Sequence, residues 1–149
     1  DHPGTKYLHK GTFSRGKGLF SGIEHKGAEE QPDEEYPFVL TTGRVLYHYH
    51  TGTMSRKVKG LNEKVPGAYV EISPTTAEKL GVSDGEMIQV SSRRGSIKLK
   101  AKLSSRVKGN VVFVPFHFAE AAANTLTNSV LDPKSKIPEF KVCAVAINK

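Results

Sequence analysis

The sequence is informative first for what it lacks: it has one cysteine, no long apolar run and no signal-like N-terminus. The lone Cys143 excludes an internal disulfide and any cysteine-ligated cluster held by this chain alone. Its apolar neighbours predict a buried, inert thiol. No apolar run approaches the ~20 residues of a membrane-spanning helix. We therefore expect no membrane span and a cytoplasmic location, or a periplasmic one if a longer parent chain carries a twin-arginine signal.

Motifs of self-sufficient catalysis are also missing. The sequence contains no Gly-x-x-x-x-Gly-Lys-Ser/Thr phosphate loop and no Gly-x-Ser-x-Gly nucleophile elbow. Many of the carboxylates cluster at residues 29–35, and no acid/base pair is apparent elsewhere. We therefore predict no catalytic residue in this chain, and a free-standing small enzyme is the weaker alternative.

The composition indicates one folded, positively charged domain. The chain has 149 residues, of which 37% are hydrophobic and 25% charged, and this balance is typical of a globular domain rather than a disordered or fibrous protein. Its formal net charge is +7 at pH 7. This surplus favours an anionic partner, such as a phosphorylated cofactor, nucleic acid or an acidic protein surface, and charge alone does not choose among them.

The chain divides near residue 35. Residues 1–35 are punctuated by glycines and are lysine-rich and then acidic, which predicts an extended arm followed by an acidic linker. Residues 18–24 could form one short edge strand. Tyr36-Pro37 forces an extended entry into the apolar run that follows, so we expect residues 36–149 to form the folded domain.

That domain is predicted to be mainly β with few helices. Ser73 as N-cap, Pro74 at the first helical position and Gly81 just past the end mark one short helix. Apolar residues alternate with lysines over 97–103, which predicts a strand with one buried and one wet face. Further strands are expected at 38–40, 69–72, 86–92, 111–116 and 141–147. Many short strands separated by glycine turns favour a barrel or a sandwich.

The first candidate binding segment directly follows the apolar run 38–40. Gly43 allows close backbone approach, and Arg44 offers a planar fork suited to phosphate or a ring edge. The alternative is a surface loop with a solvated arginine. His48 and His50 would point to one side of an extended segment, but they lack a third ligand, so we predict no metal site. Hydrogen bonding to a ligand phosphate suits these imidazoles better.

Three later residues complete the candidate site. Phe116 follows an apolar strand, where an aromatic ring completes a barrel core more often than it stacks on a ligand. Asn124 ends an alanine-rich helical turn, and it either caps that turn or presents its amide to a ring edge. Lys141 opens the last predicted strand, so its stem can lie along the barrel with the ammonium at the rim.

Several of these motifs occur in an order and spacing that resemble one family. The motifs are Tyr36-Pro37-Phe38-Val39-Leu40-Thr41-Thr42-Gly43-Arg44, His48-Tyr49-His50-Thr51-Gly52-Thr53-Met54-Ser55-Arg56, Ser91-Ser92-Arg93-Arg94-Gly95, Asn124-Thr125-Leu126-Thr127, Asp132-Pro133, Phe140-Lys141 and Cys143-Ala144-Val145. With these motifs the sequence resembles, from Tyr36 to its end, the C-terminal dinucleotide-binding domain of molybdopterin oxidoreductases, above all of formate dehydrogenase large subunits and bacterial nitrate reductases.

The resemblance implies a double-psi β-barrel that holds molybdopterin guanine dinucleotide, two of which chelate molybdenum or tungsten. It implies that the metal-ligating residue and any iron–sulfur cluster belong to upstream domains of a larger subunit, so that this domain alone is inactive. Those upstream domains and electron-transfer subunits are the implied partners, and formate is the preferred substrate over nitrate. The implied cofactor-binding residues are Thr42, Gly43, Arg44, Leu46, Tyr47, His48, His50, Thr51, Phe116, Asn124, Phe140 and Lys141.

A different class of function is a basic β-barrel adaptor that binds RNA or an acidic protein partner. It requires exposed aromatic residues interleaved with the basic ones. Lys98, Lys100 and Lys102 instead form a solvent-facing stripe with no aromatic residue between them. We therefore expect no nucleic-acid partner.

Overall fold

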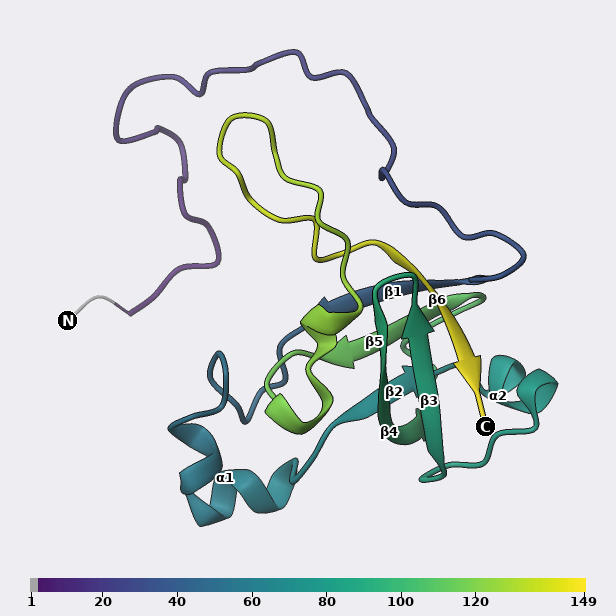
Figure 1. Ribbon diagram of the computed structural model, residues 1–149. Helices are drawn as coiled ribbons and strands as arrows, with labels where there is room; N and C mark the ends of the chain where they lie inside the picture. Colours follow the sequence, from purple (N-terminus) through teal and green to yellow (C-terminus); the bar gives the residue numbers. More distant parts are fainter. Residues whose placement is uncertain (1–2) are drawn as a thin grey trace.

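Six strands close into a barrel in the computed structural model, which describes residues 3–149 (Figure 1). Residues 1 and 2, at the start of the predicted arm, lie outside the described residues. The strands are β1 (Phe38–Gly43), β2 (Tyr69–Ile72), β3 (Met87–Ser92), β4 (Gly95–Leu103), β5 (Val111–Pro115) and β6 (Cys143–Asn148). Their order around the barrel is β1-β5-β2-β4-β3-β6.

The helical elements are short. They are η1 (Ser55–Lys57), α1 (Lys59–Lys64), α2 (Pro74–Leu80), η2 (Ala119–Ala121) and η3 (Ala123–Thr125). Across residues 3–149, no helix has the length and apolar character needed to cross a bilayer.

Two parallel strand pairs define the topology. β1 runs parallel to β5 from Val39↔Val111 to Gly43↔Pro115, and β2 runs parallel to β4. The remaining neighbours around the barrel are antiparallel. This mainly β closed barrel confirms the double-psi β-barrel that the resemblance implied. Because β1 and β5 end side by side, the segments that follow them leave the barrel at the same end.

The barrel interior is filled by aliphatic side chains, and Leu40, Val70, Val90 and Val112 are fully buried. Each such side chain contributes roughly 1.5–3 kcal/mol through removal of its apolar surface from water. On β4 the apolar residues face inward and the lysines face outward, as the alternating sequence predicts. The core therefore forms a rigid support for the loops at the barrel ends.

Helix α2 has the predicted ends. The Thr76 N–H donates to Ser73 Oγ at 3.2 Å, and Pro74 is the first helical residue. Gly81 takes the left-handed conformation, at φ 65°, and its N–H bonds to the carbonyls of the last turn. The Thr76 hydroxyl also donates to the Gly109 carbonyl at 2.8 Å, which fastens α2 to the turn before β5.

The predicted edge strand at residues 18–24 is wrong, since the structure forms no strand there. Every strand of the closed barrel already has two neighbours, so no free strand edge is available for pairing. The arm instead follows an arc outside the barrel (Figure 1), and Leu19, Phe20 and Ile23 are each at least 90% exposed. Elements η1 and α1 were not predicted from the sequence, and β6 begins two residues later than expected.

Cys143 generates a test of the packing. Its thiol is fully buried at the start of β6, and burial raises the pKa of the thiol. Because the thiolate is the reactive species, we expect the folded chain to resist a thiol-specific disulfide reagent and the guanidinium-unfolded chain to react with one equivalent. Rapid reaction of the folded chain, measured by release of the coloured leaving group, would contradict the fold at β6.

Candidate functional site

Eight of the predicted site residues line one pocket of about 530 Å³, here named the rim pocket. They come from three stretches of sequence, which are the end of β1 with the loop after it, the segment after β5, and the segment that leads into β6. The lining residues are Thr42, Arg44, His50, Thr51, Phe116, Asn124, Phe140 and Lys141. The parallel pairing of β1 with β5 is what brings the first two segments together.

Two hydrogen bonds join β1 to the segment that leads into β6 in the wall of the rim pocket. The Thr42 hydroxyl donates to the Phe140 carbonyl at 2.8 Å, and the Lys141 ammonium donates to the Thr42 carbonyl at 2.5 Å. Gly43 lies close to these contacts. A Cβ atom there would lie 2.8 Å from the Phe113 ring and 3.8 Å from Lys141 Nζ, so a side chain at this position would have to displace the ring. The contacts hold the Lys141 cation at the barrel rim.

His117 fastens the loop after β1 to the end of β5, a role that was not predicted from the sequence. Its side chain is buried; Nε2 accepts a hydrogen bond from the Val45 N–H at 2.9 Å, and Nδ1 donates to the His50 carbonyl. Burial lowers the pKa of His117, in keeping with the neutral imidazole that this pair of partners requires. His50 has a φ of 46°, which non-glycine residues rarely adopt, and the contact from His117 holds this conformation. The signal for His117 was its place between two aromatic residues directly after an apolar strand.

His48 does not lie in the rim pocket. Its Nε2 donates to the Val65 carbonyl at 2.6 Å, and its Nδ1 accepts from the Ser55 hydroxyl at 3.1 Å. The ring also packs edge-on against Phe118, with 5.4 Å between ring centroids. Both ring nitrogens therefore have protein partners, so His48 helps to hold this loop, and its predicted ligand contact stays a prediction.

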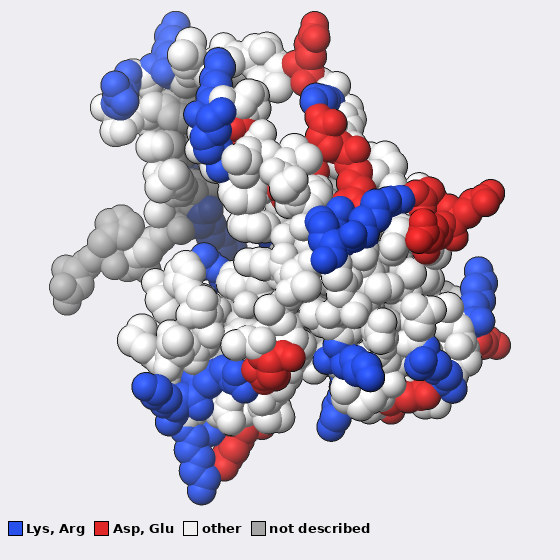
Figure 2. Space-filling model, in the orientation of Figure 1, with Lys and Arg blue, Asp and Glu red and all other residues white. Residues whose placement is uncertain are grey.

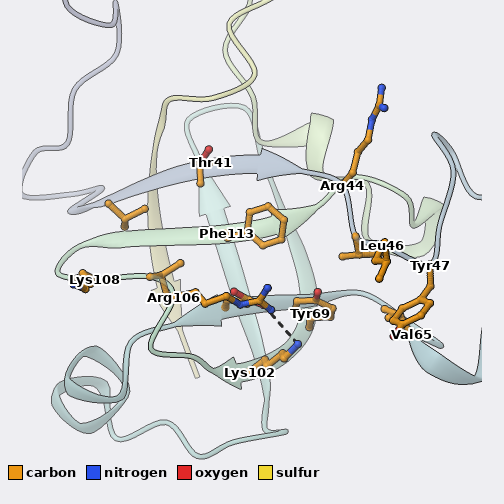
Figure 3. A pocket seen from close by; sticks show the side chains of 14 residues that line it. Thr41, Arg44, Leu46, Tyr47, Val65, Tyr69, Lys102, Arg106, Lys108 and Phe113 are labelled. Carbon is orange, nitrogen blue, oxygen red and sulfur yellow. Dashed lines mark hydrogen bonds and ion pairs between the residues drawn. The ribbon is translucent and has the colours of Figure 1, made fainter. Parts of the chain in front are cut away.

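A larger pocket of about 800 Å³ lies on the outer face of β1, β5 and β2 (Figure 3). The predicted residues Leu46 and Tyr47 line this pocket and not the rim pocket. Arg44 lines both, and in Figure 3 it extends away from Lys102 and Tyr69. Ten of the twelve predicted residues thus line one or both of these pockets, and Gly43 and His48 line neither.

A buried carboxylate organises the larger pocket. Glu71 is 3% exposed, and it pairs with Arg106 at 2.8 Å and with Lys102 at 3.5 Å. The Lys102 ammonium also lies over the Tyr69 ring, 4.4 Å from its centroid. This corrects the expected lysine stripe, because Lys102 contacts an aromatic ring on the neighbouring strand β2. The sequence feature that could have indicated this buried ion pair is the glutamate inside the otherwise apolar run 69–72.

The chemistry of the rim pocket is cationic and aromatic. Arg44 and Lys141 supply two positive charges, and none of its lining residues is acidic. Phe116 packs partly against the core and partly lines the pocket, beside Phe140. Within residues 3–149, no three histidine, cysteine or acidic side chains are placed to bind a metal ion together. The pocket is suited to an anionic ligand that carries planar rings.

Residues 38–144 match the protein family described as "Molydopterin dinucleotide binding domain". The match extends over more than half of the chain, from β1 into β6. The chain therefore belongs to the molybdopterin dinucleotide-binding domain family.

Individual relatives agree with this family. The chain is 48% identical over 151 residues to the F420-dependent formate dehydrogenase subunit alpha of Methanocaldococcus jannaschii, a match that covers 100% of this chain and 22% of the relative. It is 41% identical to the assimilatory nitrate reductase catalytic subunit of Bacillus subtilis, covering 99% and 21%. The solved structure of acetylene hydratase from Pelobacter acetylenicus matches with a TM-score of 0.68 and 20% identity, over 78% of this chain and 19% of that one, and shows a shared fold. The chain spans about a fifth of the length of these curated relatives.

Replacing His117 tests how the loop is held. His117→Ala leaves the Val45 N–H unpaired, so we expect the free energy of unfolding to fall by about 2 kcal/mol, measured by urea denaturation. His25→Ala, in the exposed arm, is the matched control and should change nothing.

The same residue predicts a pH dependence. The folded-state pKa of His117 lies below the unfolded value of about 6.5, so the unfolded chain takes up this proton first as the pH falls. The contribution of His117 to the free energy of unfolding is fully present above the unfolded pKa and declines as the pH falls below it. Between about pH 7.5 and about pH 5.5, the decline should be smaller in His117→Ala than in the wild type. Equal declines would show that His117 is not held neutral.

Proposed function

We propose that this chain is the cofactor-binding domain of a molybdopterin-dependent oxidoreductase similar to formate dehydrogenase, and that the rim pocket binds part of molybdopterin guanine dinucleotide. The observation that carries the proposal is the rim pocket itself, in which two cations, hydroxyls and two phenyl rings meet without an acidic residue at one end of the barrel. The family match supports a dinucleotide cofactor, and the guanine form with molybdenum or tungsten is part of the proposal.

The residues of the rim pocket suit this cofactor in separate ways. Arg44 and Lys141 place positive charge beside its pyrophosphate or pterin, and Asn124 offers an amide to a ring edge. Phe116 and Phe140 present apolar surface to planar rings. When bound, the cofactor supplies the metal-centred redox chemistry; this chain binds and orients it and contributes no catalytic side chain.

The remaining parts of the reaction belong to the whole oxidoreductase. We propose that residues 36–149 are one domain of a larger subunit, that residues 1–35 are its arm and linker, and that upstream domains supply the metal ligand and any iron–sulfur cluster. Formate is favoured over nitrate because the formate dehydrogenase relatives are 46–48% identical and the nitrate reductase relatives 38–41%. We propose electron-transfer subunits as partners. A cytoplasmic location is preferred, and a periplasmic nitrate reductase among the relatives keeps the alternative open.

An NMR titration of the 149-residue chain tests the cofactor proposal. We expect GDP and molybdopterin guanine dinucleotide to shift the resonances of Arg44, Asn124 and Lys141. Arg44→Met and Lys141→Met should each weaken binding about tenfold, because each removes a charge-assisted contact to the phosphates. Lys98→Met, on the outer face of β4, is the control and should bind like the wild type.

The adaptor alternative is favoured by one observation, the cationic larger pocket in which Lys102 lies over Tyr69. Against it, the basic side chains are scattered over the face shown in Figure 2. Titration with a short oligouridylate separates the two functions. Shifts confined to the lysines of β4, with no response of the rim pocket to either nucleotide, would support the adaptor and overturn the cofactor proposal.

A further inference from the structure

An ion-pair cluster ties the acidic linker to the hairpin between β3 and β4. Arg93 pairs with Glu30 at 2.8 Å and with Asp33, and its guanidinium lies over the Tyr36 ring, 4.6 Å from the centroid. Arg94 pairs with the same Glu30 at 2.8 Å. The Glu30 side chain is only 12% exposed, so this pairing is shielded from water more than a surface ion pair is. The linker is thus held against the hairpin turn.

Arg94 reaches from this cluster toward the rim pocket. Its guanidinium donates to the Leu126 carbonyl twice, from Nε at 3.1 Å and from Nη2 at 2.8 Å. Leu126 directly follows η3, the turn that carries Asn124. The Thr127 hydroxyl donates to the Asn124 carbonyl at 3.1 Å, which closes the same turn on its other side. One guanidinium therefore joins the linker to the segment that places Asn124.

A second, independent contact joins the hairpin to η3. A Cβ atom on Gly95 would lie 2.8 Å from the Thr125 methyl group, so the hairpin turn packs closely against the turn that carries Asn124. The two contacts, at the Thr125 side chain and at the Leu126 carbonyl, lie on the two residues that directly follow Asn124. A displacement of the hairpin would therefore displace Asn124.

We propose that Glu30 and Arg94 are positioning residues for Asn124 and so set how the rim pocket recognises the ring system of its ligand. The proposal rests on the cofactor-binding function proposed above. Neither residue lines the rim pocket. Glu30, fixed by the linker, orients the Arg94 fork, and the fork holds η3 so that the Asn124 amide lies in the pocket wall. The cations Arg44 and Lys141 are outside this arrangement, so recognition of rings and recognition of phosphates have separate supports.

Arg94→Lys tests this arrangement because lysine keeps the charge toward Glu30 but lacks the planar fork that donates twice to one carbonyl. We expect the side-chain amide resonance of Asn124 to move before any ligand is added. Affinity for molybdopterin guanine dinucleotide should fall about three- to tenfold. Affinity for inorganic pyrophosphate, which has no ring, should stay unchanged. A merely structural loss of stability would weaken both ligands alike. Arg106→Lys, which alters the pair with Glu71, is the matched control.

Glu30→Gln is the second variant, and it keeps the test decisive if Arg94→Lys folds poorly. It should give a smaller change in the same direction, with the dinucleotide weakened and pyrophosphate unaffected. If the wild type binds the dinucleotide and both folded variants bind it equally well with an unmoved Asn124 resonance, the positioning role is overturned alone. If the wild type binds neither ligand, the cofactor proposal fails, and the Asn124 resonance still decides whether Glu30 and Arg94 hold the turn.

Discussion

The parallel pairing of β1 with β5 is the constraint on which the site depends. It ends at Gly43↔Pro115, so two loops that are about seventy residues apart in sequence leave the barrel side by side. Parallel strands require long crossover connections, and here the connection from β1 to β5 contains β2, β3 and β4 of the same barrel. His117 then fixes one loop to the other through Val45 and His50. Without this register, the residues of the rim pocket would lie on different parts of the surface.

Much of the fold could be predicted because its signals are local. The ends of α2 depend on Ser73 and Gly81, which act within a few residues, and the two faces of β4 follow from alternation along one strand. The composition of residues 18–24 is compatible with a short edge strand, but pairing needs a free strand edge, and a closed barrel has none. Helix α1 was missed because it buries no residue and so has no apolar stripe to reveal it.

The candidate site was less accessible to sequence reasoning than the fold. Local patterns indicated single candidates such as Arg44 and Lys141. The family resemblance grouped them into one site, since nothing local in the sequence relates Thr42 to Lys141 across 99 residues. It did not supply side-chain directions. His48 turns inward because Ser55 and Val65 offer partners to both of its ring nitrogens. These partners lie 7 and 17 residues further along the chain, so they can be identified only when the backbone course of the loop is known.

Arg44 borders both pockets, and this has a thermodynamic consequence. The N–H donors that Arg44 gives to a molecule in one pocket are not available to a molecule in the other. A molecule or protein segment that binds Arg44 from the larger pocket therefore removes part of the positive charge available to the rim pocket. By linkage, whatever occupies the rim pocket weakens the first interaction by the same factor. Ligands of the rim pocket and of the larger pocket would thus be energetically coupled through one side chain, without any movement of the strands between them.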